Sequence, residues 1–243
     1  MILTVTNKSN FLAYFLNPVS RLSNSCIVNI GNEDISTIIA AADNTSILYA
    51  RYKTDLGESG NKINLPDLSR LNKILQCIEG DKFKLELDRN CIRYKDLNIQ
   101  FKYHLLEDDI LTSPPISTDK IAGLTFNTNF KVPYSSILNL IKTSTFAINL
   151  NKLYFFTKDG NVYAEINDKQ SHNVDSVCIK LCEGYSGEDI KDPLPLSFET
   201  IRTIVGAKCE YITINVNSQL NVMTFDINNS ESKLTYIVSG LIK

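Results

Sequence analysis

Apolar residues recur at helical spacing in four short segments of the chain. These segments cover residues 7–23, 66–79, 133–143 and 197–208. In residues 66–79 the apolar stripe comprises Leu68, Leu71, Ile74, Leu75 and Ile78. Polar side chains occupy the opposite side, as in a helix that packs one face against a core. We therefore expect four amphipathic helices, each with one buried face.

Alternation of apolar and polar residues, which is typical of antiparallel strands with one buried face, fills much of the remaining chain. Phe83, Leu85 and Leu87, for example, alternate with charged residues. Turn residues separate such runs from one another. The expected strands lie within residues 2–5, 26–30, 36–41, 47–53, 81–88, 90–96, 98–105, 124–132, 153–158, 162–166, 176–182, 210–216, 220–227 and 233–241.

The order of elements in residues 66–105, a helix followed by three strands, is repeated in residues 197–241. Leu71 corresponds to Ile201 at an offset of 130 residues, and one inserted residue raises the offset to 131 in the strands that follow. Each of the other two quarters of the chain contains a strand, then a helix, then three strands. We therefore predict an α+β fold of two similar domains, each with two short helices packed on antiparallel β-sheets.

A segment of different composition lies between the two halves. Residues 107–120, EDDILTSPPISTDK, combine acids, Ser, Thr and a Pro pair, which favours an extended linker over a regular element. We therefore predict a first domain over residues 1–108, a connector over 109–120 and a second domain over 121–243.

Composition places the chain among soluble globular proteins. The hydrophobic content is 43% and the formal net charge is −2, so a surface coated with nucleic acid or bound to a membrane is not indicated. No apolar run approaches the roughly 20 residues of a membrane helix. The N-terminal residues lack the features of a signal peptide, and we expect a cytoplasmic location.

The residue types of common catalytic and metal sites are sparse. The six cysteines lie inside periodic segments, and Cys178 and Cys182 are spaced for neither a zinc pair nor a disulfide within one strand. Neither histidine lies near a recognisable partner motif. No P-loop, GxSxG or HExxH pattern occurs, and turns explain the three Gly- and acid-bearing stretches. We expect no enzymatic activity, metal or cofactor.

Positive charge is concentrated on the polar faces of the predicted helices. The four segments carry a net charge of +4, which leaves −6 on the rest of the chain. Two cations on one helix usually only contact solvent, but the same bias on all four favours phosphate binding. No recognition helix is present, so we predict non-specific contacts that permit sliding along DNA. The predicted DNA-binding residues are Lys8, Arg21, Arg70, Lys73, Lys142, Arg202 and Lys208.

In the order of its elements and in several local motifs, the chain resembles the DNA sliding clamps, a family that includes proliferating cell nuclear antigen and T-even-type bacteriophage processivity factors. AADNTSILYA at 41–50 is similar to the acidic turn of the first clamp domain, and YKDLNIQFKYHLLEDDIL at 94–111 to the end of that domain. IKLCEGYSGEDI at 179–190, followed by LSFETIRTIV, resembles a phage-clamp strand, loop and helix. Lys142 stands where phage clamps carry a basic residue.

The resemblance implies a ring that encircles duplex DNA and tethers the replicative DNA polymerase for processive synthesis. Three copies would join head to tail, with helices around the hole and sheets outside. The edges that pair would be the strands near residues 97–105 and 174–182. Joining edges in this way removes an aggregation liability of open sheets.

The resemblance also implies a pocket for short hydrophobic peptides of the polymerase and the clamp loader, under the interdomain connector. By position its residues would be Ala42, Ile110, Leu111, Pro114, Pro115, Ile116, Leu220 and Val238.

Two alternatives remain open from the residues. One is a monomeric DNA-binding processivity factor of the same fold, for which +4 on four helices is a modest charge. The other is a β-rich viral structural protein. The abundance of Asn, Ile and Lys suggests an AT-rich genome, such as that of a bacteriophage, in which case the location would be the cytoplasm of a bacterial host.

Overall fold

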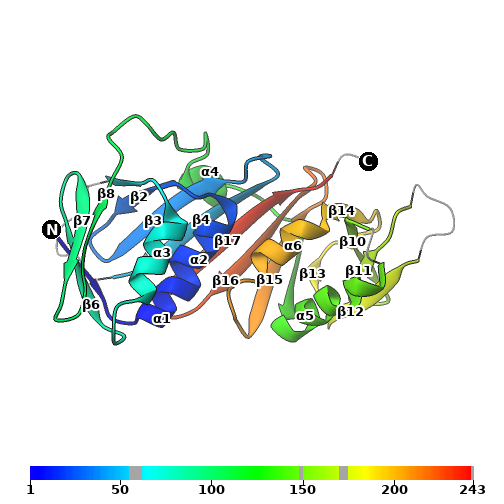
Figure 1. Ribbon diagram of the computed structural model, residues 1–243. Helices are drawn as coiled ribbons and strands as arrows, with labels where there is room; N and C mark the ends of the chain where they lie inside the picture. Colours follow the sequence, from blue (N-terminus) through cyan, green and yellow to red (C-terminus); the bar gives the residue numbers. More distant parts are fainter. Residues whose placement is uncertain (55–61, 148–149, 170–174, 242–243) are drawn as a thin grey trace. The chain divides into compact units, whose positions relative to one another are not determined.

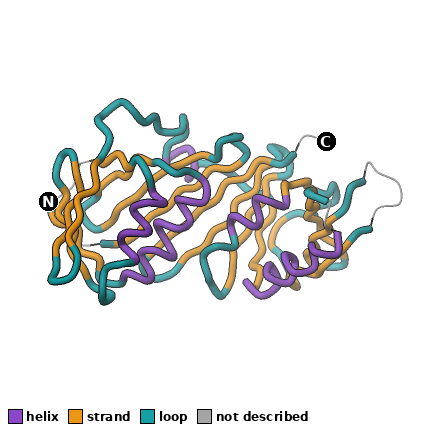
Figure 2. Tube along the Cα trace, in the orientation of Figure 1, coloured by secondary structure: helices purple, strands orange, loops and turns teal. Residues whose placement is uncertain are grey.

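The chain forms two compact units, each with helices packed against antiparallel sheets (Figures 1 and 2). The computed structural model describes residues 1–54, 62–147, 150–169 and 175–241. Unit 1 comprises Met1–Ala122 with Asn229–Leu234, and unit 2 comprises Gly123–Asn228 with Thr235–Lys243. Short helices on antiparallel sheets confirm the predicted α+β class.

The first sheet of unit 1 joins the N-terminal strand to three strands that are consecutive later in the chain. Its order is β1-β6-β7-β8, and all neighbours are antiparallel. The strands are β1 (Ile2–Val5), β6 (Phe83–Leu87), β7 (Cys91–Lys95) and β8 (Gln100–His104). Since β8 ends this order, its outer edge has no neighbouring strand within the described part of the chain.

Four other strands of unit 1 are antiparallel neighbours in the order β5-β2-β3-β4. The strands are β2 (Cys26–Ile30), β3 (Asp34–Ala40), β4 (Ser46–Lys53) and β5 (Lys62–Leu65). In β3, burial alternates residue by residue, as the period of two predicts.

Two helical segments lie side by side in unit 1 (Figure 1). The first is continuous and comprises α1 (Lys8–Phe11), a π-helical turn η1 (Leu12–Leu16) and α2 (Asn17–Leu22). The second is α3 (Leu68–Gln76). The amide of Asn72 donates to the side-chain oxygen of Asn17 and links the two polar faces.

The apolar stripes of these helices form the core of unit 1. Leu68 and Leu75 are completely buried. The rings of Phe11 and Phe15 stack with centroids 5.7 Å apart, and the ring of Tyr52 meets Phe11 edge-on at 5.3 Å. Aromatic pairs of this geometry contribute beyond their buried area, so they fix the first helical segment on β4.

Unit 2 likewise contains two sets of neighbouring strands. One set has the order β13-β9-β15-β16-β17, and the other is a four-stranded sheet of the order β14-β10-β11-β12. The strands of the first are β9 (Thr128–Pro133), β13 (Ser186–Gly187), β15 (Tyr211–Asn217), β16 (Val222–Asn228) and β17 (Ser232–Ser239). Those of the second are β10 (Lys152–Lys158), β11 (Asn161–Ile166), β12 (Val177–Glu183) and β14 (Leu194–Ser197).

The helices of unit 2 are α5 (Tyr134–Thr143), a 3-10 turn η2 (Ser144–Ala147) and α6 (Phe198–Ile204). Ile137, Ile201 and Ile204 are buried below them. Phe155 of β10 meets Phe225 of β16 edge-on, with centroids 6.2 Å apart, and so joins the two sheets. As with β8, the outer edge of β12 has no neighbour in the strand order of the described residues.

Several element boundaries differ from the sequence-based expectation. The predicted linker is not extended throughout, because Thr118–Ala122 forms a short helix, α4, with Asp119 in its first turn. The helix predicted to reach residue 208 ends at Ile204, so Lys208 is not helical. Residue 174, at the start of one expected edge strand, lies outside the described residues.

Strand β14 was not predicted because Pro195 and a following helix obscured its short pattern. Proline lacks a backbone donor and is tolerated where a strand ends a sheet. β14 ends the order β14-β10-β11-β12, so the position of Pro195 is consistent with that rule.

The N-terminus of α3 depends on one side chain. Asp67 is the N-cap, and its carboxylate accepts a hydrogen bond from the backbone N–H of Arg70 at 2.8 Å. We expect Asp67→Ala to lower the free energy of unfolding by about 1 kcal/mol, measured by urea denaturation. Asp67→Ser, which keeps an acceptor, should lose less than half of that amount, and equal losses in the two variants would contradict a capping role.

Candidate nucleic-acid interface

The outward face of α3 presents two predicted DNA-binding residues, Arg70 and Lys73. Both are exposed, because Leu71 and Leu75 on the opposite side of the helix are buried. The carboxylate of Asp67 caps the helix by accepting a hydrogen bond from the backbone N–H of Arg70. The helix therefore holds two cations one turn apart on a rigid support.

Arg70 is oriented by β8. Its guanidinium carbon lies 6.0 Å from the centre of the Tyr103 ring, within reach of a cation–π interaction. The Tyr103 hydroxyl donates to the carbonyl of Asp67 and accepts from its N–H, both at 2.8 Å. Burial raises the pKa of Tyr103 to about 12, so the hydroxyl stays protonated at neutral pH. Tyr103 thus ties the first turn of α3 to the edge of the sheet.

The other predicted cations of unit 1 differ in exposure. Lys8 is half-buried, and its ammonium group donates to the carbonyl of Ile78, just beyond α3. Its charge is therefore directed at backbone of its own unit. Arg21 is exposed in the last turn of α2.

In unit 2, the predicted cations Lys142, Arg202 and Lys208 are all exposed. Lys142 lies in the last turn of α5. Arg202 is paired with Glu199, with N and O 3.0 Å apart, and lies over the Phe198 ring at 4.9 Å. An exposed pair of this kind is weak, but it reduces the charge that Arg202 presents to a ligand.

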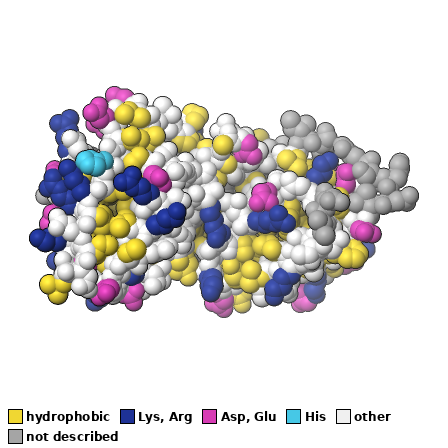
Figure 3. All heavy atoms as spheres, in the orientation of Figure 1, with side chains coloured by type: hydrophobic (Ala, Val, Ile, Leu, Met, Phe, Trp, Pro, Cys, Tyr) yellow, Lys and Arg dark blue, Asp and Glu magenta, His cyan; other side chains and the backbone are white. Residues whose placement is uncertain are grey.

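Basic side chains on the face shown in Figure 3 are spread over the helices and strands and do not form one block. Short polar residues, such as Asn72 and Gln76 of α3, separate them. Such a surface can make a few contacts with phosphates but offers no array for reading base edges.

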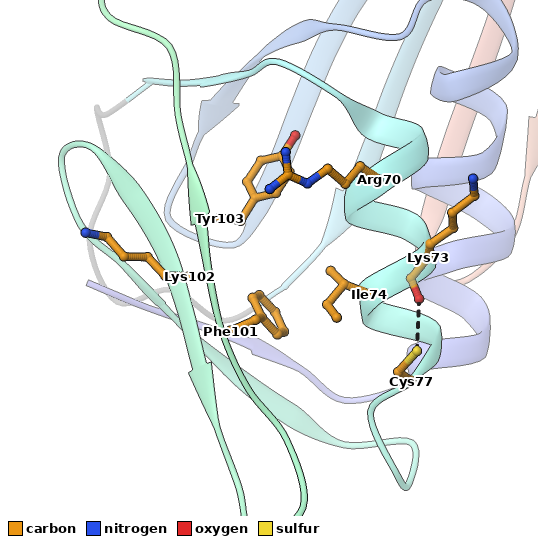
Figure 4. A pocket seen from close by; sticks show the side chains of 7 residues that line it. All are labelled: Arg70, Lys73, Ile74, Cys77, Phe101, Lys102 and Tyr103. Carbon is orange, nitrogen blue, oxygen red and sulfur yellow. Dashed lines mark hydrogen bonds between the residues drawn. The ribbon is translucent and has the colours of Figure 1, made fainter.

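A small pocket lies between α3 and β8, and we call it the α3–β8 pocket (Figure 4). Its volume is about 340 Å³. Its lining residues are Arg70, Lys73, Ile74, Cys77, Phe101, Lys102 and Tyr103. The sequence had assigned Ile74 and Phe101 only to core stripes, and the exposed Lys102 was not singled out.

A groove of about 470 Å³ lies on unit 1 beneath the segment that follows β8. Residues of β2 and β3 line it together with five of the residues predicted for a peptide pocket: Ala42, Ile110, Leu111, Pro114 and Pro115. Ile110 is 57% exposed although it is apolar.

Three residues predicted for the same pocket do not line this groove. Ile116 is half-buried, Leu220 is 62% exposed at the turn before β16, and Val238 is buried in β17 at 1% exposure. The side chain of Val238 belongs to the core, because consecutive residues of β17 are buried on both faces.

Solved structures share this architecture over the whole chain. A structure of A. fulgidus proliferating cell nuclear antigen (PCNA) with the C-terminal region of FEN-1 bound has a TM-score of 0.79 and 13% identity, covering 100% of this chain and 98% of that chain. The chain has the fold of a sliding clamp. The Entamoeba histolytica PCNA matches with a TM-score of 0.79 and 11% identity, over 99% and 98% of the two chains.

The PCNA2–PCNA3 complex of Sulfolobus tokodaii has the same sliding-clamp fold, with a TM-score of 0.75, 13% identity and 99% coverage of both chains. No family model and no curated protein sequence matches this chain. At such low identity the likeness is one of fold, and the bacteriophage origin stays a prediction.

Two further features of the described residues concern membrane-spanning helices and metal sites. No helix among them is long and apolar enough to cross a membrane. No group of three His, Cys, Asp or Glu residues within the described ranges could hold a metal ion.

Exposure distinguishes Ile110 from Val238. We expect Ile110→Ser to change the free energy of unfolding by less than about 0.5 kcal/mol, because its side chain already contacts water. Val238→Ser should cost roughly 2 kcal/mol or more, since it leaves a cavity and a buried hydroxyl. Chemical denaturation measures both, and a large loss in Ile110→Ser would show that Ile110 is a structural residue of unit 1.

Proposed function

We propose that the chain is the subunit of a sliding clamp, which encircles duplex DNA and tethers the replicative polymerase for processive synthesis. The observation that carries this proposal is the match of the whole chain to PCNA structures, with a TM-score of 0.79 over 100% of its length. Both units contribute helices with exposed cations, as duplication predicts.

The proposed ring consists of copies joined head to tail through β8 of one copy and β12 of the next. Each strand ends a four-stranded sheet, so each offers backbone donors and acceptors to a partner. A heterologous contact between two different edges closes into a ring when the rotation per copy allows it. We propose three copies, with domain limits at residues 108 and 120.

The proposed role of the helices is to hold duplex DNA weakly within the ring. Arg70, Lys73, Lys142 and Lys208 are exposed cations, while Arg202 is paired and Lys8 is directed at Ile78. A closed ring retains DNA by topology, so a few sequence-independent phosphate contacts are sufficient and do not prevent sliding.

The groove beneath residues 110–115 is the proposed docking site for short hydrophobic segments of the polymerase and the clamp loader. Its lining includes the apolar residues Ile39, Ala42 and Ile110. In one of the similar PCNA structures, the C-terminal region of FEN-1 is bound. An exposed Ile110 supports a partner that covers it.

A ring and a monomeric processivity factor differ in mass and in how they hold DNA. We expect sedimentation at micromolar concentration to give a multiple of 27.3 kDa, and electron micrographs to show a central hole. After incubation with nicked circular plasmid at high protein concentration, the ring should remain on the circle in 0.3 M salt and be released when one cut linearises the plasmid. Release from circular and linear DNA alike, by a particle of 27.3 kDa, would contradict the clamp.

The helix cations can be tested separately from ring assembly. Arg21→Ala combined with Lys142→Ala should lower affinity for linear duplex and reduce the slope of log affinity against log salt by about 0.9 for each phosphate that the variant no longer neutralises. Fluorescence anisotropy at several salt concentrations measures both quantities.

The matched control removes two exposed strand cations, Lys84 of β6 and Lys131 of β9, which face away from the buried side of their sheets. Lys84→Ala with Lys131→Ala changes the net charge by the same amount. An equal effect of the two double variants on the salt slope would mean that DNA does not select the helix face.

A further inference from the structure

The α3–β8 pocket has an apolar interior that opens to solvent beside β8, the edge strand of its sheet in the described part of the chain. Figure 4 shows Ile74 of α3 and Phe101 of β8 pointing toward one another, with Cys77 beside them. Ile74 and Phe101 are half-buried and Cys77 is exposed. Within its own chain, this pocket of about 340 Å³ therefore leaves apolar surface in contact with water.

The rim of the pocket is cationic. Arg70, Lys73 and Lys102 are exposed, and none of the lining residues is acidic. Cations beside an apolar hollow favour an aromatic occupant, because the face of an aromatic ring attracts positive charge while its carbon atoms fill the hollow.

Unit 2 presents an exposed aromatic ring beside β12, the edge strand of its four-stranded sheet among the described residues. Phe146 lies in η2, which contacts β12, and its side chain is 65% exposed. The turn that carries it is held in place, because the Ser144 hydroxyl donates to the carbonyl of Ile141 at 2.7 Å and the Thr145 hydroxyl donates to that of Lys142 at 2.8 Å. Ser144 and Ala147 on either side are buried, so Phe146 projects from a fixed backbone.

The two features lie on corresponding faces of their sheets. The pocket is on the side of β8 that faces α3, where Tyr103 is buried. Phe146 belongs to the helical segment that covers β12, where Leu181 is buried. If β8 of one copy pairs with β12 of another, strands about 4.8 Å apart form one sheet, and the pocket and Phe146 then lie on the same side of it.

We propose that the α3–β8 pocket receives the Phe146 ring of a neighbouring copy and that this contact is the apolar anchor of the subunit interface. The inference rests on the proposed ring and specifies which side chains hold it together. Pairing of the two strands would set the orientation of one copy on the next. Burial of an aromatic ring in a pocket is the kind of contact that contributes most of the binding energy of an interface.

The test compares Phe146→Ala with Leu220→Ala in the full chain. Both side chains are more than 60% exposed, but Leu220 has no place in the proposed contact. Phe146→Ala should raise the dissociation constant of the assembled particle about thirtyfold or more, measured by sedimentation over a dilution series, while Leu220→Ala leaves it within about threefold. Unchanged thermal unfolding of a diluted, monomeric sample shows that both variants fold.

Cys77 reports whether the pocket itself is filled. Its thiol is exposed in the single chain, so alkylation of Cys77, followed by mass spectrometry, should slow as the wild-type protein assembles. In Phe146→Ala, Cys77 should remain reactive up to higher protein concentrations.

The outcomes separate this inference from the proposed function. A wild-type ring whose dissociation constant and Cys77 reactivity are unaffected by Phe146→Ala overturns the anchor but leaves the clamp intact. A wild-type protein that stays monomeric overturns both. Protection of Cys77 only after addition of duplex DNA assigns the pocket to DNA and overturns the anchor.

Discussion

Burial of the apolar stripe of each helix against a sheet is the constraint on which the other features depend. Leu68, Leu71 and Leu75 can leave water only if α3 lies flat on its sheet, and this orientation turns Arg70 and Lys73 outward. The capping carboxylate of Asp67 and the hydroxyl of Tyr103 then fix where the helix begins. The same packing in unit 2 places Lys142 on the outward face of α5.

Packing of the helices does not satisfy the backbone groups at the outer edges of β8 and β12, where the four-stranded sheets end. An open strand edge carries unpaired donors and acceptors, and natural proteins cover such edges or join them. Next to β8 lies an apolar pocket, and next to β12 lies the exposed Phe146. Joining the two edges would satisfy the backbone groups and remove both apolar surfaces from water.

The distribution of charge is consistent with weak, sequence-independent contact with DNA. Arg202 is partly neutralised by Glu199, and Lys8 is directed at the carbonyl of Ile78. Fewer cations are therefore available to phosphates than the sequence predicted. A surface of this kind would bind duplex DNA poorly as an isolated subunit. In the proposed ring, retention comes from closure around the duplex, and weak contacts are then an advantage because they permit movement.

Periodicity determined the secondary structure to a large extent, since the spacing of apolar residues follows directly from helix and strand geometry. The α+β class, the four principal helices and the duplication follow from it. The failures are short or terminal features: the strands β5 and β14, the short helix α4 and the end of α6 at Ile204. The sequence also contains the cations, but it could not tell that Lys8 and Arg202 are engaged within the chain.

Only the tertiary structure decided which apolar residues are buried and which are available to a partner. Ile110 and Val238 are alike in chemistry, yet one is exposed above a groove and the other lies in the core of β17. The α3–β8 pocket exists because the packing of α3 over β8 brings Ile74 to Phe101. Contacts between residues distant in the chain depend on how elements pack, and local spacing carries no information about that packing.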